Sequence, residues 1–384
     1  MDFVCTFVYN LFVFWGLTQL LDIHYFGDLA FLLAIGVLLS PAIVLSLPNF
    51  ILLSNKIRYQ DKVNAARLYT QAILIALLVP LAILLYCFSY KILMIFFVLQ
   101  SLLSISEIIP RTLWKNRSAK SYTTRHICLV TVKITILLFL FFKAPENFML
   151  GVITLNFITT VYFWKSVKAE KLSLQESLLI LKQAWVFSKP LLISGLIVLL
   201  YTRTDQLMIK FMIDSKALAE YSVAIKVSDG VNSVWTSVQA FFLHVLLTNQ
   251  ERYRSFISLA WIYGIICFIV IFFVSDIAVL TIFGSAFVAS SDVIKILSFG
   301  TAFVALNSVG AIWLQSKNLG YLTPLRSMCG LVVNVIGNVI MIPAFGIAGA
   351  ALSTVFSQFA VCFIAPFFSR HSLKLIKLQI LLRV

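Results

Sequence analysis

Charged residues are scarce in this chain of 384 residues. Asp, Glu, Lys and Arg together make up 12% of it, whereas hydrophobic residues make up 61%. An ordinary soluble domain is about 25% charged and roughly 45–50% apolar. So little polar surface cannot cover a water-soluble globule. The composition therefore excludes a cytosolic enzyme, a secreted disulfide scaffold and a disordered regulator, and it predicts an integral membrane protein.

Sequence motifs of the common enzyme classes are also missing. The chain has no Walker phosphate loop, no HExxH and no G-x-S-x-G pattern. Its six cysteines are single residues within apolar segments, with no CxxC pair and no Cys/His ligand spacing. The most polar interior segment, 165–189, is too short for a soluble catalytic domain. We therefore expect neither an enzyme nor a resident metal or cofactor.

Apolar stretches recur along the whole sequence at a length that fits a bilayer. A transmembrane helix needs about 20 mainly apolar residues. Twelve such spans are predicted: 2–21, 29–53, 69–88, 92–110, 127–142, 148–164, 189–212, 218–246, 256–275, 293–315, 322–343 and 349–369. The semi-apolar segment 276–292 predicts an interfacial loop. Gly346, Gly349 and Ala350, after Pro343, predict a tight turn or close packing between the last two spans.

Positive charge is in excess, with 30 Lys+Arg against 15 Asp+Glu and a net charge of +15. If the N-terminus is cytoplasmic and the spans alternate, most basic residues fall in cytoplasmic segments. The opposite side receives Lys91, Lys143, Lys210, Lys216 and Lys295. This asymmetry follows the positive-inside rule and predicts an even number of spans with both termini cytoplasmic. It also accounts for the positive charge without nucleic acid.

The two halves of the chain echo each other. Phe26–Phe31 (FGDLAF) and Leu218–Val223 (LAEYSV) share a small-acidic-apolar-small pattern at an offset of half the chain length, six spans apart. We therefore predict an all-α protein with a 6+6 parallel repeat around a central cavity. The predicted parts are an N-terminal six-helix lobe (1–165), an amphipathic cytoplasmic linker (166–188), a C-terminal six-helix lobe (189–369) and a basic cytoplasmic tail (370–384).

Ionisable residues inside spans are costly in hydrocarbon unless they are paired or face water. Arg203 and Gln206 share one face of the seventh span, and Ser222, Lys226 and Asp229 share one face of the eighth. An antiparallel hairpin turning near 213–217 places these charges, together with Asp205, at similar depth. Because Asp205 follows Arg203 by two residues, the two cannot share a helix face.

Two interpretations of these charges remain open. They are either neutralising ion pairs that hold the hairpin together, or groups that line a water-filled cavity and contact a charged substrate or a coupling ion. Lys133, about 9 Å inside the fifth span at 1.5 Å per residue, either extends back to the interface or faces a cavity. Asn334 and Asn338, spaced i, i+4, form either interhelical hydrogen bonds or part of that cavity.

Several segments of the sequence resemble a known family. They are Arg203–Ile209 (RTDQLMI), Ala219–Ala224 (AEYSVA), Pro343–Thr354 (PAFGIAGAALST) and Tyr25–Ala30 (YFGDLA). In order and spacing they resemble the polysaccharide-transport family of Wzx-like O-antigen flippases, of the superfamily that includes MATE exporters and the lipid II flippase. The resemblance covers essentially the whole chain and is strongest over 186–365. Members commonly start with a short basic or polar segment, whereas this chain starts Met1-Asp2-Phe3, almost within the first span.

The resemblance implies a bacterial inner-membrane protein with two lobes around a cationic cavity. Its implied function is to translocate an undecaprenyl-diphosphate-linked oligosaccharide, the O-antigen repeat unit, from the cytoplasmic to the periplasmic leaflet by alternating access. Implied partners are this lipid, membrane lipids, and a polysaccharide polymerase with its chain-length regulator. A proton or a sodium ion is the coupling ion discussed for the superfamily.

The charges inside the spans agree with such a substrate. A diphosphate carries about two negative charges, to which Arg offers paired donors and Lys a point charge. Arg203, Lys226 and Lys133 are therefore predicted to bind the substrate, and Asp205 and Asp229 to pair with these cations or bind a coupling ion. The predicted polar cavity positions are Gln206, Ser222, Asn334 and Asn338.

Two other functions are alternatives to the flippase. The first alternative is a MATE-type small-molecule antiporter. An exporter of cationic drugs should carry more acidic than basic cavity residues, and three cations against two anions favour an anionic substrate instead. The second alternative, a membrane polymerase, would be expected to carry a long external loop, which the sequence lacks.

Overall fold

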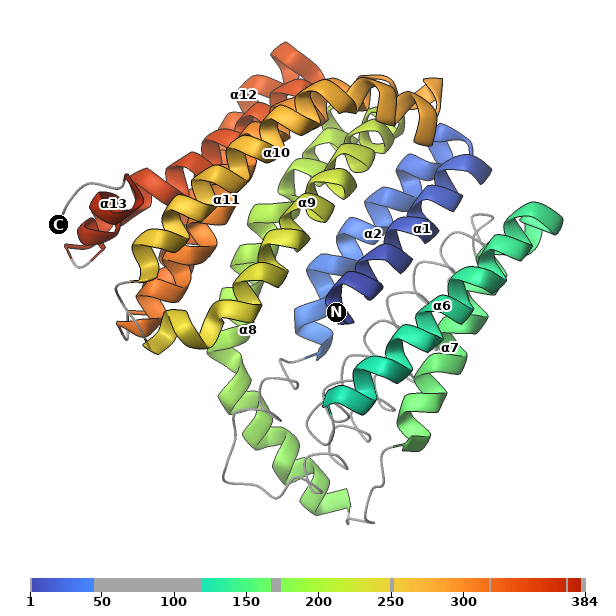
Figure 1. The fold of residues 1–384 in the computed structure, drawn as a ribbon, viewed down its shortest axis with the longest axis horizontal. Helices are drawn as coiled ribbons and strands as arrows, with labels where there is room; N and C mark the ends of the chain where they lie inside the picture. The colour runs from blue at the N-terminus through green and yellow to red at the C-terminus, as the bar shows by residue number, and fades with distance from the viewer. Residues whose placement is uncertain are drawn as a thin grey trace. The chain divides into compact units, whose positions relative to one another are not determined.

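A computed structural model describes residues 2–44, 119–166, 174–248, 252–317, 319–370 and 372–380. Within these ranges every regular element is a helix (Figure 1). The helices are α1 (Asp2–Leu20), α2 (Ile23–Val44), α6 (Ala119–Lys143), η1 (Pro145–Asn147), α7 (Phe148–Ser166), α8 (Leu174–Met212), α9 (Ser215–Thr248), α10 (Arg252–Ile282), η2 (Ser285–Phe287), α11 (Ala289–Ser316), α12 (Leu322–Phe359), η3 (Ala360–Ile364), η4 (Ala365–Phe368) and α13 (Leu373–Gln379). The predicted all-α class is confirmed. The predicted spans 69–88 and 92–110, and the end of 29–53, lie outside the described residues.

Length and composition qualify several of these helices to cross a membrane. Among the described residues, four apolar segments are long enough: Thr124–Lys143, Arg252–Ile282, Ala289–Ser316 and Leu322–Phe368. Shorter apolar segments cover Cys5–Leu20 in α1 and Ile23–Leu38 in α2. The protein is therefore a multi-pass membrane protein.

The helices divide into two compact units. Unit 1 contains residues 3–31 and 197–384, so it combines α1 and the start of α2 with the helices from the end of α8 onward. Unit 2 contains residues 32–196, where α6 and α7 form a hairpin that turns at Pro145–Asn147. The predicted division at 165 and 188 stays a prediction. Helix α8 is continuous, so the predicted linker helix and the seventh span belong to one helix.

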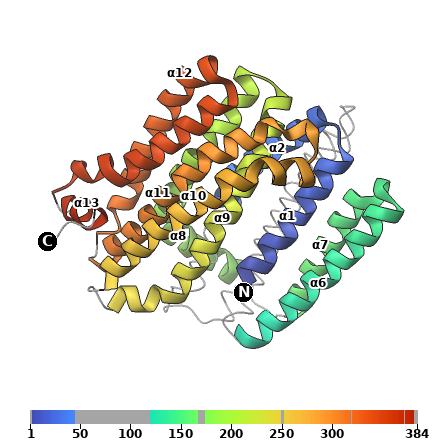
Figure 2. The same cartoon turned by 45° about the horizontal axis from the view of Figure 1, so that its top comes forward.

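The core of unit 1 lies between α9, α10, α11 and α12, which run side by side in Figures 1 and 2. Buried aromatic and aliphatic side chains from these helices, among them Trp235, Tyr253 and Leu306, form one cluster. Helices α10 and α11 approach closely at Gly264, because a Cβ there would lie 2.3 Å from the Cβ of Ala302. Small residues at such a crossing allow close van der Waals packing between membrane helices.

The expected interfacial loop over 276–292 is wrong at both ends. Helix α10 continues to Ile282, and α11 begins at Ala289. The chain turns instead at Gly284, whose φ of 89° suits a residue without a side chain. Both acidic residues of this segment pair with Lys295 of α11: Asp276 pairs across the two helices, with its carboxylate oxygen 2.7 Å from Nζ, and Asp292 pairs within α11 at 3.5 Å.

The last two predicted spans form the two arms of α12. Helical geometry breaks at Gly346, where φ is 59° and ψ is −136°. A Cβ at Gly349 would lie 2.0 Å from the carbonyl oxygen of Met341, so the arms meet where a side chain cannot fit. Further along, Asn334 and Thr354 are hydrogen-bonded across the arms, as expected for an antiparallel hairpin. The predicted turn is confirmed.

Candidate functional site

The α8–α9 hairpin of unit 1 carries the central charges. Its turn is held by Asp214, whose carboxylate accepts a 2.7 Å hydrogen bond from the backbone N–H of Ala217 and caps the start of α9. As the hairpin register predicts, Arg203 and Asp229 face each other across it, with Nη2 3.5 Å from Oδ2. The side chains of Arg203 and Asp229 are 20% and 42% exposed, so the pair is half-open.

Arg203 uses its donors incompletely. Nη1 donates to Oε1 of Gln206 at 3.4 Å, and the contact of Nη2 with Asp229 is long. The buried Nε of Arg203 has no hydrogen-bond partner in the described part of the chain. A guanidinium with a spare donor and one weak ion pair can still accept an anion.

Lys226 lies one turn before Asp229 on α9. Its ammonium stands over the ring of Phe14 of α1, 5.5 Å from the ring centroid. Among the described residues no carboxylate lies within 4 Å of its Nζ, because Asp229 pairs with Arg203 instead. Lys226 lines an apolar groove together with α1. The half-open group of Arg203, Lys226 and Asp229 therefore carries a net positive charge, and we call it the cation group.

Asp205 is separated from the cation group. Its carboxylate is buried and accepts hydrogen bonds from the hydroxyls of Tyr221 and, at 3.3 Å, Thr354 of α12. It also accepts the backbone N–H of Gln206 at 2.8 Å. Helix register predicts one common group of charges: Arg203, Asp205, Lys226 and Asp229. The structure divides this group, because Asp205 lies on the opposite face of α8 and points toward α12.

The hydrogen bonds of Asp205 continue into α12. Asn334 donates from Nδ2 to Oγ1 of Thr354 at 3.3 Å, and Asn338 donates from Nδ2 to Oδ1 of Asn334 at 3.0 Å. Both amides are fully buried, and the Oδ1 of Asn338 has no hydrogen-bond partner in the described residues. We call the set Asp205, Tyr221, Thr354, Asn334 and Asn338 the Asp205 network.

The donor atoms of the Asp205 network are carboxylate, amide and hydroxyl oxygens. Such oxygens suit hard cations rather than transition metals. The described residues contain no group of three or more His, Cys, Asp or Glu side chains able to hold a metal ion. The network thus contains a single carboxylate, and the amide oxygen of Asn338 is left without a hydrogen-bond partner among the described residues.

The remaining predicted positions are placed as follows. Ser222 is buried, and its hydroxyl has no partner in the described part of the structure. Lys133, in unit 2, is buried and donates from Nζ to Oδ1 of Asn156 on α7 at 2.8 Å. Lys133 therefore does not extend back to the end of its helix. It is a buried cation held by a neutral amide.

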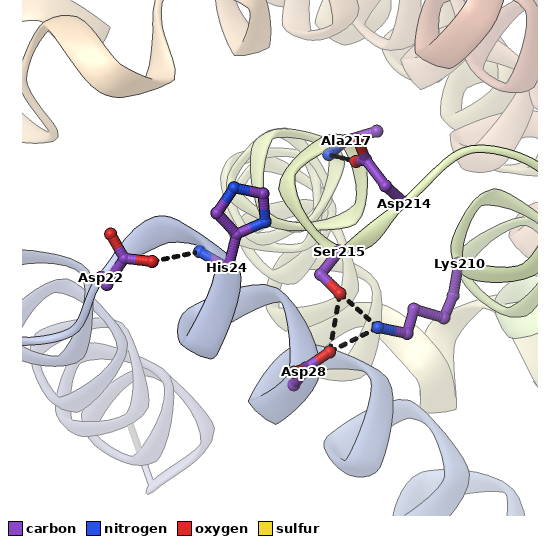
Figure 3. A network of polar contacts seen from close by, with 7 residues as sticks. All are labelled: Asp22, His24, Asp28, Lys210, Asp214, Ser215 and Ala217. Atoms are coloured by element: carbon purple, nitrogen blue, oxygen red, sulfur yellow. Dashed lines mark hydrogen bonds and ion pairs between the residues drawn. The ribbon is translucent and has the colours of Figure 1, made fainter.

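A second polar network was missed by the sequence analysis (Figure 3). Lys210 of α8 and Ser215 of α9 both bind the carboxylate of Asp28 on α2, the latter at 2.7 Å. A Cβ at Gly27 would lie 1.8 Å from the carbonyl oxygen of Ser215, so the two helix starts touch at backbone distance. The α1–α2 turn is thus fastened to the α8–α9 turn. The repeated FGD and AEY motifs marked these turns, but nothing in them identified Lys210 as the partner.

Arg326 is another buried charge, and the distribution of basic residues along the sequence does not predict its burial. Its side chain is almost fully buried in α12. Nη2 donates to Oδ1 of Asn307 at 2.6 Å, and Nε donates to the carbonyl oxygen of Val361 at 3.3 Å. Val361 belongs to the π-helical segment Ala360–Ile364. Arg326 therefore ties α11 and the end of the α12 hairpin together through neutral acceptors.

Comparison with known proteins identifies the fold. No protein-family model matches the chain, and no curated protein matches it. Among solved structures, the lipid II flippase MurJ in an inward closed conformation is 13% identical, with 98% of this chain and 89% of that chain covered and a TM-score of 0.72. An inward-facing multidrug resistance MATE family transporter of the MOP superfamily is 10% identical, with coverage of 98% and 96% and a TM-score of 0.65.

A third structure with this fold is a MOP superfamily transporter from Pyrococcus furiosus, described as having a binding pocket of reverse polarity. It is 13% identical, with coverage of 98% and 94% and a TM-score of 0.53. These likenesses show that the chain has the all-helical fold of MOP-superfamily membrane transporters. The proteins that share it here are transporters and flippases rather than enzymes.

Proposed function

We propose that this protein is a flippase for an undecaprenyl-diphosphate-linked oligosaccharide such as an O-antigen repeat unit. It moves this lipid from the cytoplasmic to the periplasmic leaflet of a bacterial inner membrane by alternating access, with both of its termini in the cytoplasm. The observation that carries the proposal is the cation group. Lys226 lacks a carboxylate partner among the described residues, and Arg203 has only a long ion pair, within a MOP-type membrane fold.

An anionic head group fits the charges of the cation group. Unpaired charges are costly inside a membrane. The cation group carries one positive charge more than its single carboxylate neutralises, so an anion that binds there stabilises the remaining positive charge. Two unit charges 4 Å apart interact by about 4 kcal/mol at an effective dielectric constant near 20. Arg203 can bind two phosphate oxygens with its planar donors, and Lys226 can bind a third. In this proposal the diphosphate displaces Asp229 as the partner of Arg203.

A MATE-type antiporter is the second candidate, favoured by the shared fold with a MATE family transporter. An exporter of cationic drugs needs an accessible anion, and the carboxylate of the cation group, Asp229, is 42% exposed. Because it already faces Arg203, a cationic drug would meet net repulsion there. The charge balance thus supports the flippase over the antiporter.

The export experiment uses a strain that lacks its own copy of this gene and carries the variants on a plasmid. Arg203→Ala and Lys226→Ala are expected to abolish surface polysaccharide while the protein remains in the membrane. Lys295→Ala is the matched control, because Lys295 pairs with Asp276 away from the cation group, and it should display polysaccharide normally. Full display by both Arg203→Ala and Lys226→Ala would exclude the cation group as a substrate site.

We further propose that the Asp205 network holds the coupling ion, a proton or a sodium ion. It offers one carboxylate, buried neutral oxygens and the spare amide oxygen of Asn338. A cation at about 100 times its dissociation constant stabilises the folded state by about 2.7 kcal/mol. Sodium chloride should therefore raise the melting temperature of the purified protein above its value in equimolar potassium chloride.

The variants separate this site from the cation group. Asp205→Asn should lose the sodium-dependent stabilisation, whereas Asp229→Asn should keep it. Stabilisation of the wild type by acid but not by sodium, lost in Asp205→Asn, would assign the proton as the coupling ion. If neither ion acts through Asp205, the proposed coupling role of the network is wrong.

A further inference from the structure

An apolar groove of about 800 Å³ runs along unit 1 beside the cation group. Helices α1 and α9 form its two long walls, and the end of α10 with Phe283 closes it. Its lining residues are Phe7, Val8, Leu11, Phe12, Trp15, Lys226, Val227, Gly230, Val231, Val234, Thr281, Ile282 and Phe283. On both long walls the lining positions follow i, i+1, i+4, i+5 and i+8, so each helix presents one continuous face. The volume lies in the range of roughly 300–1,000 Å³ that is typical of small-molecule sites.

The polar atoms that line the groove are largely satisfied by the protein. Trp15 donates from its indole nitrogen to the carbonyl oxygen of Ile282 at 2.9 Å, and Thr281 donates to that of Ile277 at 2.7 Å. Lys226 differs, since its ammonium makes no hydrogen bond or ion pair with any described residue and stands 5.5 Å from the centroid of the Phe14 ring. The groove therefore offers one available charge on an apolar surface, which suits an elongated amphiphile with an anionic head.

The rim of the groove is open along its length. Val8, Val234 and Ile282, which line it, are each about half exposed. The inner wall is close-packed at Gly230, where a Cβ would lie 2.7 Å from the ring of Phe7. The exposed rim thus leaves room for a chain-like ligand between α1 and α9.

We propose that this groove binds the polyisoprenyl chain of an isoprenyl-phosphate lipid and that Lys226 holds its first phosphate. This inference rests on the proposed function and assigns the lipid part of its substrate to a defined surface. A single groove suits a single chain, whereas a glycerophospholipid has two. Lys226 lies about 16 Å along the helix axis from Ser215, the first residue of α9. If the α8–α9 turn lies at the edge of a hydrocarbon core about 30 Å thick, this depth is near the middle of the core, where a translocating phosphate must pass and a resting phospholipid head does not sit.

The test is photolabelling of the full-length protein in phosphatidylcholine nanodiscs. Three probes carry the same photoreactive group: a polyprenyl phosphate, the uncharged polyprenol of equal length, and a phosphatidylglycerol. Mass spectrometry of the labelled peptides should place the polyprenyl phosphate within 7–15 and 226–234. Unlabelled undecaprenyl phosphate should displace it, and phosphatidylglycerol should not.

Two kinds of variant divide chain binding from phosphate binding. Lys226→Met keeps the length of the side chain without its charge, so it should lower labelling by the phosphate probe about tenfold, a typical loss for one charge-assisted hydrogen bond, and leave polyprenol labelling unchanged. Gly230→Phe fills the groove and should lower labelling by both isoprenyl probes. Val234→Phe narrows the rim without touching Phe7 and repeats this test if Gly230→Phe fails to fold.

Ile269→Phe adds the same bulk on an exposed position of α10 that does not line the groove, and it should leave all labelling unchanged. Labelling of the groove by phosphatidylglycerol that undecaprenyl phosphate does not displace would make the groove an ordinary lipid site and overturn the inference. Isoprenyl labelling spread evenly over the lipid-facing helices would also overturn it. If labelling is as expected but both Arg203→Ala and Lys226→Ala still display polysaccharide fully, the cation group is excluded as the substrate site while the assignment of the groove to the polyisoprenyl chain stands.

Discussion

Replacing Asp229 by Asn distinguishes a structural ion pair from a substrate site, because a substrate site predicts a change in substrate affinity and a structural pair predicts none. Asp229 is 42% exposed, and its oxygen lies 3.5 Å from the guanidinium of Arg203. A bare Coulomb estimate at an effective dielectric constant of 20 gives about 5 kcal/mol for that distance. Partial exposure screens the pair, and measured exposed ion pairs contribute about 1 kcal/mol at most. We therefore assign the pair about 1 kcal/mol.

If a lipid diphosphate must displace Asp229 from Arg203, the substitution removes that competing interaction. Asp229→Asn should then tighten binding of undecaprenyl diphosphate about fivefold, since 1.4 kcal/mol corresponds to a factor of ten. Arg203→Ala should weaken binding by at least tenfold, because it removes a charge-assisted donor pair. Native mass spectrometry or calorimetry on the purified protein measures both affinities.

The double variant Arg203→Ala, Asp229→Asn supplies the control. Once Arg203 is absent, the carboxylate no longer competes through it, so the gain from Asp229→Asn should shrink. If the pair only holds the hairpin together, Asp229→Asn and Arg203→Ala should lower the melting temperature alike and leave the affinity unchanged. Equal weakening of binding by both single variants would also refute the displacement model.

Two further predictions concern the turns and unit 2. Gly27→Ala places a Cβ 1.8 Å from the carbonyl oxygen of Ser215, so it should cost roughly 1–3 kcal/mol of stability, whereas Gly195→Ala, with nothing within 4 Å, should not lower the melting temperature. A Gly27→Ala protein as stable as the wild type would mean that the two turns do not touch. Lys133→Gln keeps a donor for Asn156 but removes the charge; it should reduce polysaccharide display while the protein remains in the membrane, and unchanged display would exclude Lys133 from substrate binding.

Much of the helical fold could be predicted from the sequence. A backbone in hydrocarbon must satisfy its own hydrogen bonds, which favours helices, and a helix that crosses the bilayer is visible in the sequence as a long apolar segment. Helix geometry and the α8–α9 register alone placed Arg203 and Asp229 at similar depth, where the structure joins them in an ion pair. The turn at Gly346 was also readable, since Pro and Gly cluster there. The loop at 276–292 was misread because polar residues that mark loops in a sequence can equally pair across two helices, as Asp276 and Lys295 do.

Contacts between helices distant in sequence could not be predicted. Asp205 was expected beside the cations, but its surroundings are set by α12, whose Thr354 reaches it from 149 positions away. The sequence places Lys210 near the non-cytoplasmic end of the seventh predicted span, and only the approach of α2 gives it Asp28 as a partner. A single sequence carries the periodicity of each helix but not the choice of neighbour, so the faces were predictable and the partners were not.

The most direct test of the central claim is a translocation measurement in proteoliposomes. A fluorescent undecaprenyl-diphosphate-linked disaccharide is incorporated in both leaflets, and a membrane-impermeant quencher reports how much reaches the outer leaflet over time. The wild type should expose nearly all of the fluorophore, whereas Arg203→Ala with Lys226→Ala should expose only the fraction already outside, as protein-free liposomes do. Equal exposure by the wild type and this double variant would contradict translocation through the cation group.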